Sequence, residues 1–389
     1  MSLLVLSAAD VERIVSAFAP SQLQSLMARV FVLLSSQSTE VNTPHRILIS
    51  TSNHTALFMP SRIGCPSLLG TTVKVVSVPR SNEDARGLPA STLVLDEDTG
   101  AVKAIVNARS LTALRNAAGS LLSSNLVGLR TPKNIVAFGA GKQVEAHLDM
   151  HIRFFPSIKT CTIVNRSVNE RAQSLKASLE LRFSEISFFL LSSEISSSET
   201  TESPIKVALS AADLVVCATS ATSPLFPSSW IRSGTHIILI GSYTPSMREA
   251  DAELIRRSIP TSTDQLRRSY RAGDRVAQVL LVDSREACAG EAGELIDSDV
   301  KGDEVIEIGE LVPHDSSGEP ELGGLQHITT VCHTDDSGAS QNDFVGPVTI
   351  FKSVGVGLQD VAIACAVVEM AEKEASIGTH ILNYDTKSL

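Results

Sequence analysis

The segment from Asn134 to Val144 constrains the fold of this chain more than any other stretch. The apolar residues Ile135 to Phe138 predict a buried strand, and Gly139-Ala140-Gly141 directly after them predicts a tight turn that opens a helix. At such a turn, bare backbone N–H groups can approach a pyrophosphate at the positive end of the helix. The third small position of the usual glycine pattern holds Val144, which we expect to loosen the packing of helix on strand rather than to block phosphate binding. The segment therefore predicts a dinucleotide-binding turn.

The next predicted strand indicates which dinucleotide is bound. It runs from Cys161 and ends in Asn165-Arg166-Ser167, near the spacing where this fold normally places an acidic residue on the adenosine ribose. A carboxylate would repel a 2′-phosphate, whereas a guanidinium pairs with it through charge-assisted bonds. These residues favour NADP(H). The alternative is a strand–turn–helix unit that packs and binds nothing.

The length of 389 residues exceeds the usual single core and predicts two domains. Strands and helices alternate after residue 134, which predicts a parallel, doubly wound sheet. The expected elements of this part are strands over 134–138, 160–165, 213–218 and 236–240, and helices over 142–154 and 169–180.

Residues 46–106 have a different pattern, that of an antiparallel or mixed sheet with a hairpin turn at 96–100, and a helix over about 109–125 follows. Helical spacing is also found near both ends of the chain and in its second half. The expected helices are 8–34, with Ser7 and Ser21 as N-caps, 249–257, 275–280, 286–296, and a long one from Val354 that packs onto the first domain or across a dimer. Residues 184–204 are rich in Ser and predict a solvated surface excursion, and 313–345 predicts a loop.

The net charge of −10 and the pI near 5.4 argue against a nucleic-acid or anionic membrane surface. The six cysteines are scattered without paired spacing, which fits a reduced intracellular setting. His314, His327 and His333 are expected to be solvated loop residues rather than zinc ligands, so no metal is predicted. Neither a signal peptide nor a run of membrane-spanning length is evident, and we expect a cytoplasmic protein.

Three basic residues lie in apolar or small-residue surroundings. Arg46 begins an apolar strand, Lys74 interrupts the strand Val73–Val76, and Arg115 precedes Ala117-Ala118 on a helix. A buried unpaired cation costs several kcal/mol, so each residue needs an anionic partner. A ligand carboxylate gripped by the two arginines is one candidate, and a desolvated Lys74 beside two cations would have a lowered pKa that suits proton transfer. Alternatively, Arg115 caps a helix or pairs with an acid, Lys74 snorkels at a sheet edge, and Arg46 lies at the surface.

Several blocks in one order resemble the ornithine cyclodeaminase/mu-crystallin family from about Pro44 to Ala366. The blocks are Val73-Lys74-Val75, Gly87-Leu-Pro89, Leu111 to Ala118, Gly139 to Gln143, Asn165-Arg166-Ser167, Ala212-Asp213, Gly241 to Pro245 with Arg248-Glu249, Val282-Asp283-Ser284, Glu291 to Glu294, and Phe351 to Asp360.

This resemblance implies an α/β protein in which a Rossmann doubly wound domain (129–349) is inserted in an α+β substrate-binding and dimerisation domain (1–128 plus 350–389). It implies a homodimer, with Arg46, Lys74 and Arg115 around a substrate carboxylate and with Lys74 and Arg115 as catalytic residues. Arg62 and Ser91 are further candidates for the substrate pocket. The cofactor-binding residues it implies are Gly139, Ala140, Gly141, Gln143, Asn165, Arg166, Ser167, Thr219 and Gly241.

One departure from the family separates its branches. True cyclodeaminases carry an Asp after the two small residues that correspond to Gly241-Ser242, and this chain has Tyr243 there. The resemblance therefore implies the reductase branch, in which NADPH reduces a cyclic imine (ketimine) carboxylate to a cyclic amino acid, or the reverse amino-acid oxidation takes place. The alternatives are a cyclodeaminase-type lyase with a bound dinucleotide and a non-catalytic binder of NADPH and a small ligand.

Overall fold

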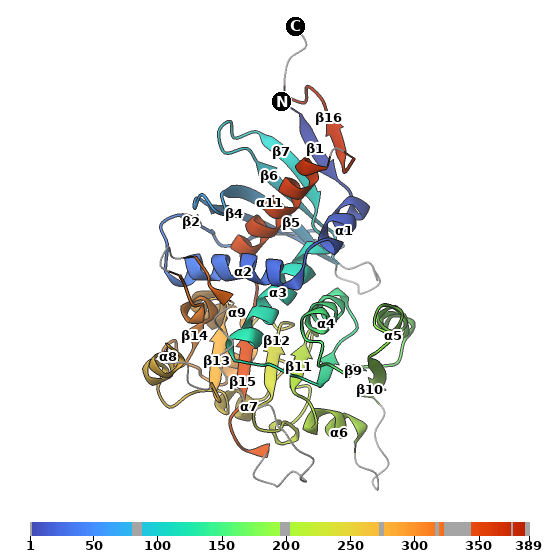
Figure 1. Ribbon diagram of the computed structural model, residues 1–389, viewed down its shortest axis with the longest axis vertical. Coiled ribbons are helices and arrows are strands. Elements are labelled where there is room, and N and C mark those ends of the chain that lie inside the picture. The colour runs from blue at the N-terminus through green and yellow to red at the C-terminus, as the bar shows by residue number, and fades with distance from the viewer. Residues whose placement is uncertain are drawn as a thin grey trace. The chain divides into compact units, whose positions relative to one another are not determined.

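The computed structural model describes residues 2–79, 88–194, 203–271, 276–315, 319–322, 344–374 and 376–385 (Figure 1). The chain divides into two compact units, which we call unit 1 (Met1–Arg115 with Val356–Leu389) and unit 2 (Asn116–Gly355). Unit 2 is thus inserted in unit 1 along the chain. The domain boundaries expected from the resemblance, after 128 and before 350, stay a prediction.

Unit 2 is built on one sheet of eight strands, all paired in parallel, in the order β10-β9-β8-β11-β12-β15-β13-β14. The strands are β8 (Asn134–Phe138), β9 (Thr160–Asn165), β10 (Ser187–Ser192), β11 (Leu214–Cys217), β12 (His236–Leu239), β13 (Val279–Val282), β14 (Ile306–Glu307) and β15 (Thr349–Lys352). The chain runs outward from β8 to β10 and then returns to β11 on the other side of β8. This reversal is the mark of a doubly wound Rossmann sheet, and it confirms the predicted fold class.

Helices connect the strands of unit 2. They are α4 (Lys142–Phe154), α5 (Glu170–Arg182), α6 (Pro204–Ser210), α7 (Ala252–Arg256), α8 (Thr263–Arg271), α9 (Arg285–Glu291) and α10 (Gly293–Asp297), with 3-10 turns at Ser228–Trp230 and Ile308–Leu311. The bounds predicted for β8, α4 and β9 are confirmed to the residue. The central strands β11, β12, β13 and β15 are buried along their whole length, because a parallel sheet is covered on both faces.

Three predictions for unit 2 are wrong. The single helix expected over 286–296 is divided into α9 and α10, because Ala292 between them has an extended backbone. Residues 187–192, within the expected solvated excursion, form the edge strand β10, and Phe188 is buried. The helix expected over 275–280 is wrong because Val279–Val282 forms β13. A short apolar run does not distinguish a buried strand from a helix by periodicity, and here the sheet decides. Residues 195–202, and most of the expected loop with His327 and His333, lie outside the described residues.

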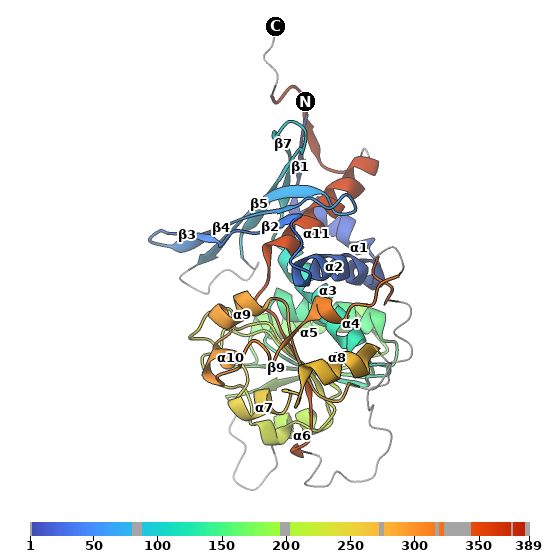
Figure 2. The same cartoon turned by 90° about the vertical axis from the view of Figure 1, so that its left-hand side faces the viewer.

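Unit 1 contains a mixed sheet of eight strands in the order β16-β1-β7-β6-β5-β4-β2, with β3 also paired to β4 (Figure 2). The strands are β1 (Leu3–Leu6), β2 (Val41–Asn42), β3 (Ile47–Ser50), β4 (His54–Ile63), β5 (Gly70–Pro79), β6 (Ala90–Leu95), β7 (Val102–Asn107) and β16 (Thr379–Ile381). Only β1 and β7 pair in parallel among them. The predicted hairpin is confirmed: the Asp96 N–H donates to Ala101 O at 2.8 Å, and Gly100 has φ +71°.

The helices of unit 1 are α1 (Ala8–Ser16), α2 (Pro20–Ser35), α11 (Gly357–Lys373) and the beginning of α3 (Leu111–Leu126). Ser7 caps α1 as predicted, whereas Ser21 does not cap α2. Ala19 holds that position because Pro20 suits the first helical turn. The helix α11 packs on the sheet against β4 and β5 and also contacts α2 (Figure 1). Of the two predicted alternatives, packing onto the first domain is confirmed.

No single helix of the described residues combines the length and the apolar character needed to cross a bilayer. The helices α1 and α2 pass that test only as a pair, which is bent by 102°.

Three buried serine–histidine pairs hold α3, α4 and β12 together in unit 2. The pairs are Ser120 with His147 (2.8 Å), Ser123 with His236 (3.0 Å) and Ser124 with His151 (3.1 Å). All three imidazoles are fully buried, and their burial lowers the pKa of His147 to about 4 and the pKa values of His151 and His236 to about 3. The histidines are therefore neutral in the folded protein.

This arrangement predicts that unit 2 loses stability in weak acid. A histidine whose pKa is lowered by folding binds its proton mainly in the unfolded chain, so the free energy of unfolding falls as pH drops below about 6.5. Each histidine contributes a slope of up to about 1.4 kcal/mol per pH unit down to its folded pKa. Urea unfolding at pH 7.5, 6 and 5 measures the slope, and His151→Gln is expected to reduce it. Equal unfolding midpoints at these pH values would contradict the prediction.

Candidate functional site

The predicted dinucleotide turn lies between β8 and α4. Gly139 has φ +108°, and a Cβ atom there would lie 2.9 Å from Ala218 O, so this position requires glycine on two counts. Its N–H donates to Val164 O at 2.8 Å, which ties the turn to β9. Val144 in the third position of the glycine pattern is fully buried.

The amino end of α4 has the features of an anion site. Gly141 is the N-cap, has no side-chain cap, and would have open space around a Cβ atom. Two residues further on, the side-chain oxygen Oε1 of Gln143 is buried and has no hydrogen-bond partner among the described residues. This oxygen is an acceptor, so it would take a hydrogen bond from a donor group rather than bind a phosphate. Uncapped N–H groups at the positive end of a helix of this length favour a phosphate. Ala140, Gly141 and the start of α4 therefore fit the pyrophosphate of a dinucleotide, while Gly139 shapes the turn and a cofactor contact of Gln143 stays a prediction.

The loop after β9 presents the residues expected at the adenosine end. The Asn165 amide donates to Ser167 O at 2.8 Å, and the Ser192 hydroxyl donates to Arg166 O at 2.8 Å, so both ends of the loop are fixed. Arg166 itself is exposed. Its guanidinium is accessible to the 2′-phosphate of a dinucleotide from solvent.

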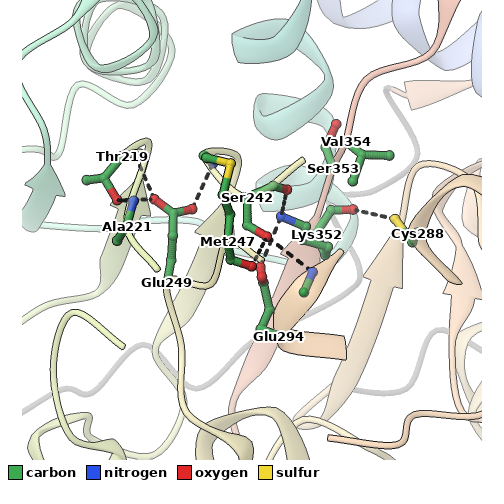
Figure 3. A network of polar contacts seen from close by, with 12 residues as sticks. Thr219, Ala221, Ser242, Met247, Glu249, Cys288, Glu294, Lys352, Ser353 and Val354 are labelled. Atoms are coloured by element: carbon green, nitrogen blue, oxygen red, sulfur yellow. Dashed lines mark hydrogen bonds and ion pairs between the residues drawn. The ribbon is translucent and has the colours of Figure 1, made fainter. Parts of the chain in front are cut away.

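Two further predicted cofactor residues, Thr219 and Gly241, follow β11 and β12, and Glu249 binds both of them. Figure 3 shows its contact with Thr219. One oxygen of this buried carboxylate accepts from the Thr219 N–H (2.6 Å) and hydroxyl (2.9 Å), and the other accepts from the Gly241 N–H (2.7 Å). A Cβ atom on Gly241 would overlap Thr219 O, so the two loops touch there. The N–H groups of Thr219 and Gly241 are therefore hydrogen-bonded within the protein. The sequence analysis gave no role to Glu249, the residue that accepts these bonds.

A buried acid–base pair lies beside the contacts of Glu249. Lys352, at the end of β15, lies 3.0 Å from Glu294 and donates to Ser242 O at 2.5 Å, and both charged side chains have no exposed surface (Figure 3). Burial raises the pKa of Glu249, which the charge of Lys352 opposes. The ends of β12 and β15 are therefore joined by one buried network of charges.

Asp283 fixes the chain that leaves β15. It accepts from the Ser353 hydroxyl at 2.6 Å and from the backbone N–H groups of Gly355 (2.7 Å) and Val354 (3.0 Å). The blocks around Asp283 and Lys352, which the sequence suggested only as family signatures, are thus neighbours in the structure.

Unit 1 brings Lys74 and Arg115 together on one carboxylate, that of Asp360. Lys74 Nζ donates to both oxygens of Asp360 at 3.0 Å, and Arg115 Nε donates to one of them at 3.2 Å. Arg115 Nη1 also donates to Gln359 Oε1 at 2.7 Å. The side chains of Lys74, Arg115 and Asp360 are 3–4% exposed, so the cluster is buried.

Burial is the main cause that lowers the pKa of Lys74, and the charge of Asp360 opposes it. Burial also acts on Asp360, but the two cations outweigh it and lower the pKa of this carboxyl. A buried cation does need an anion, as predicted, and Asp360 supplies it within the protein. For Arg115 this confirms the alternative of a pair with an acid, and the contact of these cations with a ligand carboxylate stays a prediction. The alternative of a snorkelling Lys74 is wrong, because β5 lies between β4 and β6 and is not a sheet edge.

The other predicted substrate residues differ in their surroundings. Arg46 is half-buried directly ahead of β3, and its charge is one of those that lower the pKa of Lys74. Arg62 is paired with Glu97 at 2.8 Å and is half-exposed, Ser91 is exposed, and Tyr243 is 37% exposed on the loop after β12. Asp360 is the residue that sequence reasoning left without a role. The need of Lys74 and Arg115 for an anion was the signal that pointed to it.

Among the described residues, no group of three His, Cys, Asp or Glu side chains is placed to hold a metal ion.

Comparison with known proteins relates the chain to one family. The model of the ornithine cyclodeaminase/mu-crystallin family matches residues 3–375. The chain is 30% identical to a Delta(1)-pyrroline-2-carboxylate reductase of Paracoccus denitrificans over 61% of its own length and 65% of that protein. It is 25% identical to the ketimine reductase mu-crystallin of Mus musculus over 83% of both proteins.

Solved structures share the fold. A Delta(1)-pyrroline-2-carboxylate reductase of Thermococcus litoralis, in complex with NADH and L-proline, has a TM-score of 0.73 at 23% identity, covering 97% of this chain and 100% of that one. An archaeal alanine dehydrogenase dimer with bound NAD has a TM-score of 0.71 at 20% identity, covering 98% and 99%.

Proposed function

The chain belongs to the ornithine cyclodeaminase/mu-crystallin family, and we propose from this premise that it is an NADPH-dependent reductase of a cyclic imine (ketimine) carboxylate, or catalyses the reverse oxidation of the amino acid. The observation that carries the proposal is the cluster in unit 1, where two buried cations, Lys74 and Arg115, share one carboxylate. Named relatives of the chain reduce pyrroline-2-carboxylate, ketimines and iminosuccinate.

The residues of unit 1 would bind and orient the substrate. Arg46 and Arg115 hold its carboxylate, since guanidinium groups match a carboxylate in two-point geometry. This contact fixes the imine for the reaction and supplies orientation rather than chemistry. Lys74 donates a proton to the imine nitrogen, a role that suits an ammonium group whose pKa is lowered by burial. The bound dinucleotide supplies the hydride.

The simplest test is turnover by the purified chain. With pyrroline-2-carboxylate or piperideine-2-carboxylate, NADPH absorbance at 340 nm is expected to fall, and proline or pipecolate is expected to form. Dinucleotide reduction in the presence of amino acids measures the reverse direction. Activity in neither direction would overturn the proposal. Ammonia release from ornithine without net use of the dinucleotide would favour a lyase, which lacks support from the residue at position 243, a tyrosine.

NADPH is preferred over NADH in this proposal because of Arg166. The residue follows β9, is exposed, and stands where the fold commonly carries an acid for the ribose. The Thermococcus litoralis structure contains NADH and the structure of the Paracoccus denitrificans iminosuccinate reductase contains NAD+, so the preference proposed for this chain depends on its own residues.

Arg166→Ala is therefore expected to weaken NADPH binding by about 10- to 100-fold, the loss of one charge-assisted contact. NADH binding should change less than threefold, because the 2′-phosphate is missing. Fluorescence titration of both cofactors measures the two affinities. Arg171→Ala, an exposed arginine on the following helix, is the matched control. An equal loss for both cofactors in Arg166→Ala would contradict the assignment.

We also propose a homodimer of small-molecule-binding subunits. One solved relative is described as a dimer. The side chains of Ile47, Leu48 and Ile49 on β3 are 53–60% exposed, and a run of apolar residues at a sheet edge favours pairing with a second copy. Sedimentation velocity of the purified chain tests this, and a monomer at micromolar concentration would contradict it.

A further inference from the structure

The position of Asp360 in unit 1 is fixed by the close packing of α11 on the sheet. It lies in the first turn of α11, whose first residue, Gly357, has no room for a Cβ atom because Ser61 Oγ of β4 would lie 2.1 Å away. The helix can therefore approach the sheet closely at this point. Both carboxylate oxygens of Asp360 then lie 3.0 Å from the Nζ atom of Lys74.

The neighbouring residue of α11 fixes the second cation. Gln359 Oε1 accepts from Arg115 Nη1 at 2.7 Å, and its amide donates to Arg115 O at 3.4 Å. Arg115 is thus held by consecutive residues of one helix turn. The Lys74 ammonium and the Arg115 guanidinium are oriented by α11 before any ligand is bound.

We propose that Asp360 is a positioning residue that keeps Lys74 charged and oriented, so that Lys74 can deliver a proton to the substrate nitrogen. The inference rests on the proposed function. In the step, an N–H bond of Lys74 breaks and an N–H bond forms on the imine nitrogen, while the hydride from NADPH forms the new C–H bond and leaves NADP+. Neutral Lys74 then regains a proton from water.

Charged groups on three different segments act on Lys74. These are Asp360 on α11, Arg115 on α3 and Arg46 ahead of β3. Burial and both arginines lower the pKa of Lys74, and the charge and hydrogen bond of Asp360 raise it. Without this carboxylate, all of these influences favour the neutral amine, which has no proton to give.

Asp360→Asn tests the inference because it keeps the shape and removes the charge. The pH above which kcat declines is expected to fall by about one to three units, the usual effect of a close opposite charge. In Lys74→Arg the decline is expected to vanish, because a guanidinium does not deprotonate. Glu369→Gln is the matched control: Glu369 pairs with Lys373 at 2.7 Å on the exposed side of the same helix α11, and the loss of its charge should leave the pH profile unchanged.

A second readout does not need turnover. The ¹⁵N resonance of the Lys74 ammonium in lysine-labelled protein is expected to titrate at a lower pH in Asp360→Asn than in the wild-type chain. If that variant does not fold, Asp360→Ser, which leaves room for a water molecule, replaces it. Asp360→Glu is expected to restore the wild-type titration. An unchanged titration in a folded charge-removing variant overturns the inference. A wild-type chain that is active in neither direction overturns the proposed function, and the effect of Asp360 on the charge of Lys74 is then still measured by the titration.

Discussion

Lys74→Met is expected to lower kcat for imine reduction by about 10²- to 10⁴-fold, the usual contribution of a positioned proton donor. Methionine has a similar length but carries neither charge nor proton. The substitution leaves Asp360 paired with Arg115, so the carboxylate keeps a partner. Steady-state kinetics with saturating NADPH and varied imine measure the effect on kcat and KM separately.

The control for this substitution is Lys103→Met on β7, which makes the same chemical change at a half-buried site of the same sheet. Its kcat should stay within twofold of the wild-type value. NADPH affinity should be unchanged in both variants, because the proposed cofactor residues lie in unit 2. A Lys74→Met enzyme with more than a third of the wild-type kcat would remove Lys74 from the mechanism.

Lys352→Met is expected to destabilise unit 2 by about 3–5 kcal/mol, the cost of leaving a buried charge without its partner. Glu294 has no exposed surface and lies 3.0 Å from the Lys352 ammonium, and Glu249 adds a second negative charge to the same network (Figure 3). The only tryptophan, Trp230, packs against the core of unit 2, so its fluorescence reports the unfolding of that unit.

The double variant Lys352→Met/Glu294→Gln separates charge from packing. It removes both members of the ion pair, and most of the lost stability should return because no uncompensated carboxylate remains at position 294. Urea unfolding of the wild type, both single variants and the double variant completes the cycle. If the double variant is as unstable as Lys352→Met, the loss comes from packing and not from the unpaired charge.

Local patterns were sufficient where a few consecutive residues carry the information. The apolar strand β8, the glycine turn and the helix α4 follow each other within one segment, and their bounds agree with the prediction. The same patterns failed for β13, because four buried apolar residues fit a helix and a strand equally well. Local patterns also failed for β10, because the Ser-rich composition of 184–204 is typical of a solvated segment, although Phe188 in this strand is buried.

Among the charged residues, too, some were recognised from the sequence and others only in the structure. Lys74 and Arg115 were recognised from sequence because a cation in apolar surroundings demands a partner. Their anionic partner, Asp360, could not be recognised from the sequence, because it is 286 residues from Lys74 and 245 residues from Arg115 in the chain. Glu249, which holds the loops of Thr219 and Gly241, was missed because a carboxylate after a basic residue has no local mark of burial.

By itself, the sequence determined the doubly wound sheet, the dinucleotide turn and the need for anions beside two buried cations, because these depend on periodicity, glycine geometry and the cost of burying charge. The tertiary structure alone decided which carboxylates meet those cations. The packing of α11 on β5 brings Asp360 to Lys74, and the parallel order of the strands brings Glu294 to Lys352. Such pairings depend on distances between remote segments, which no local pattern encodes.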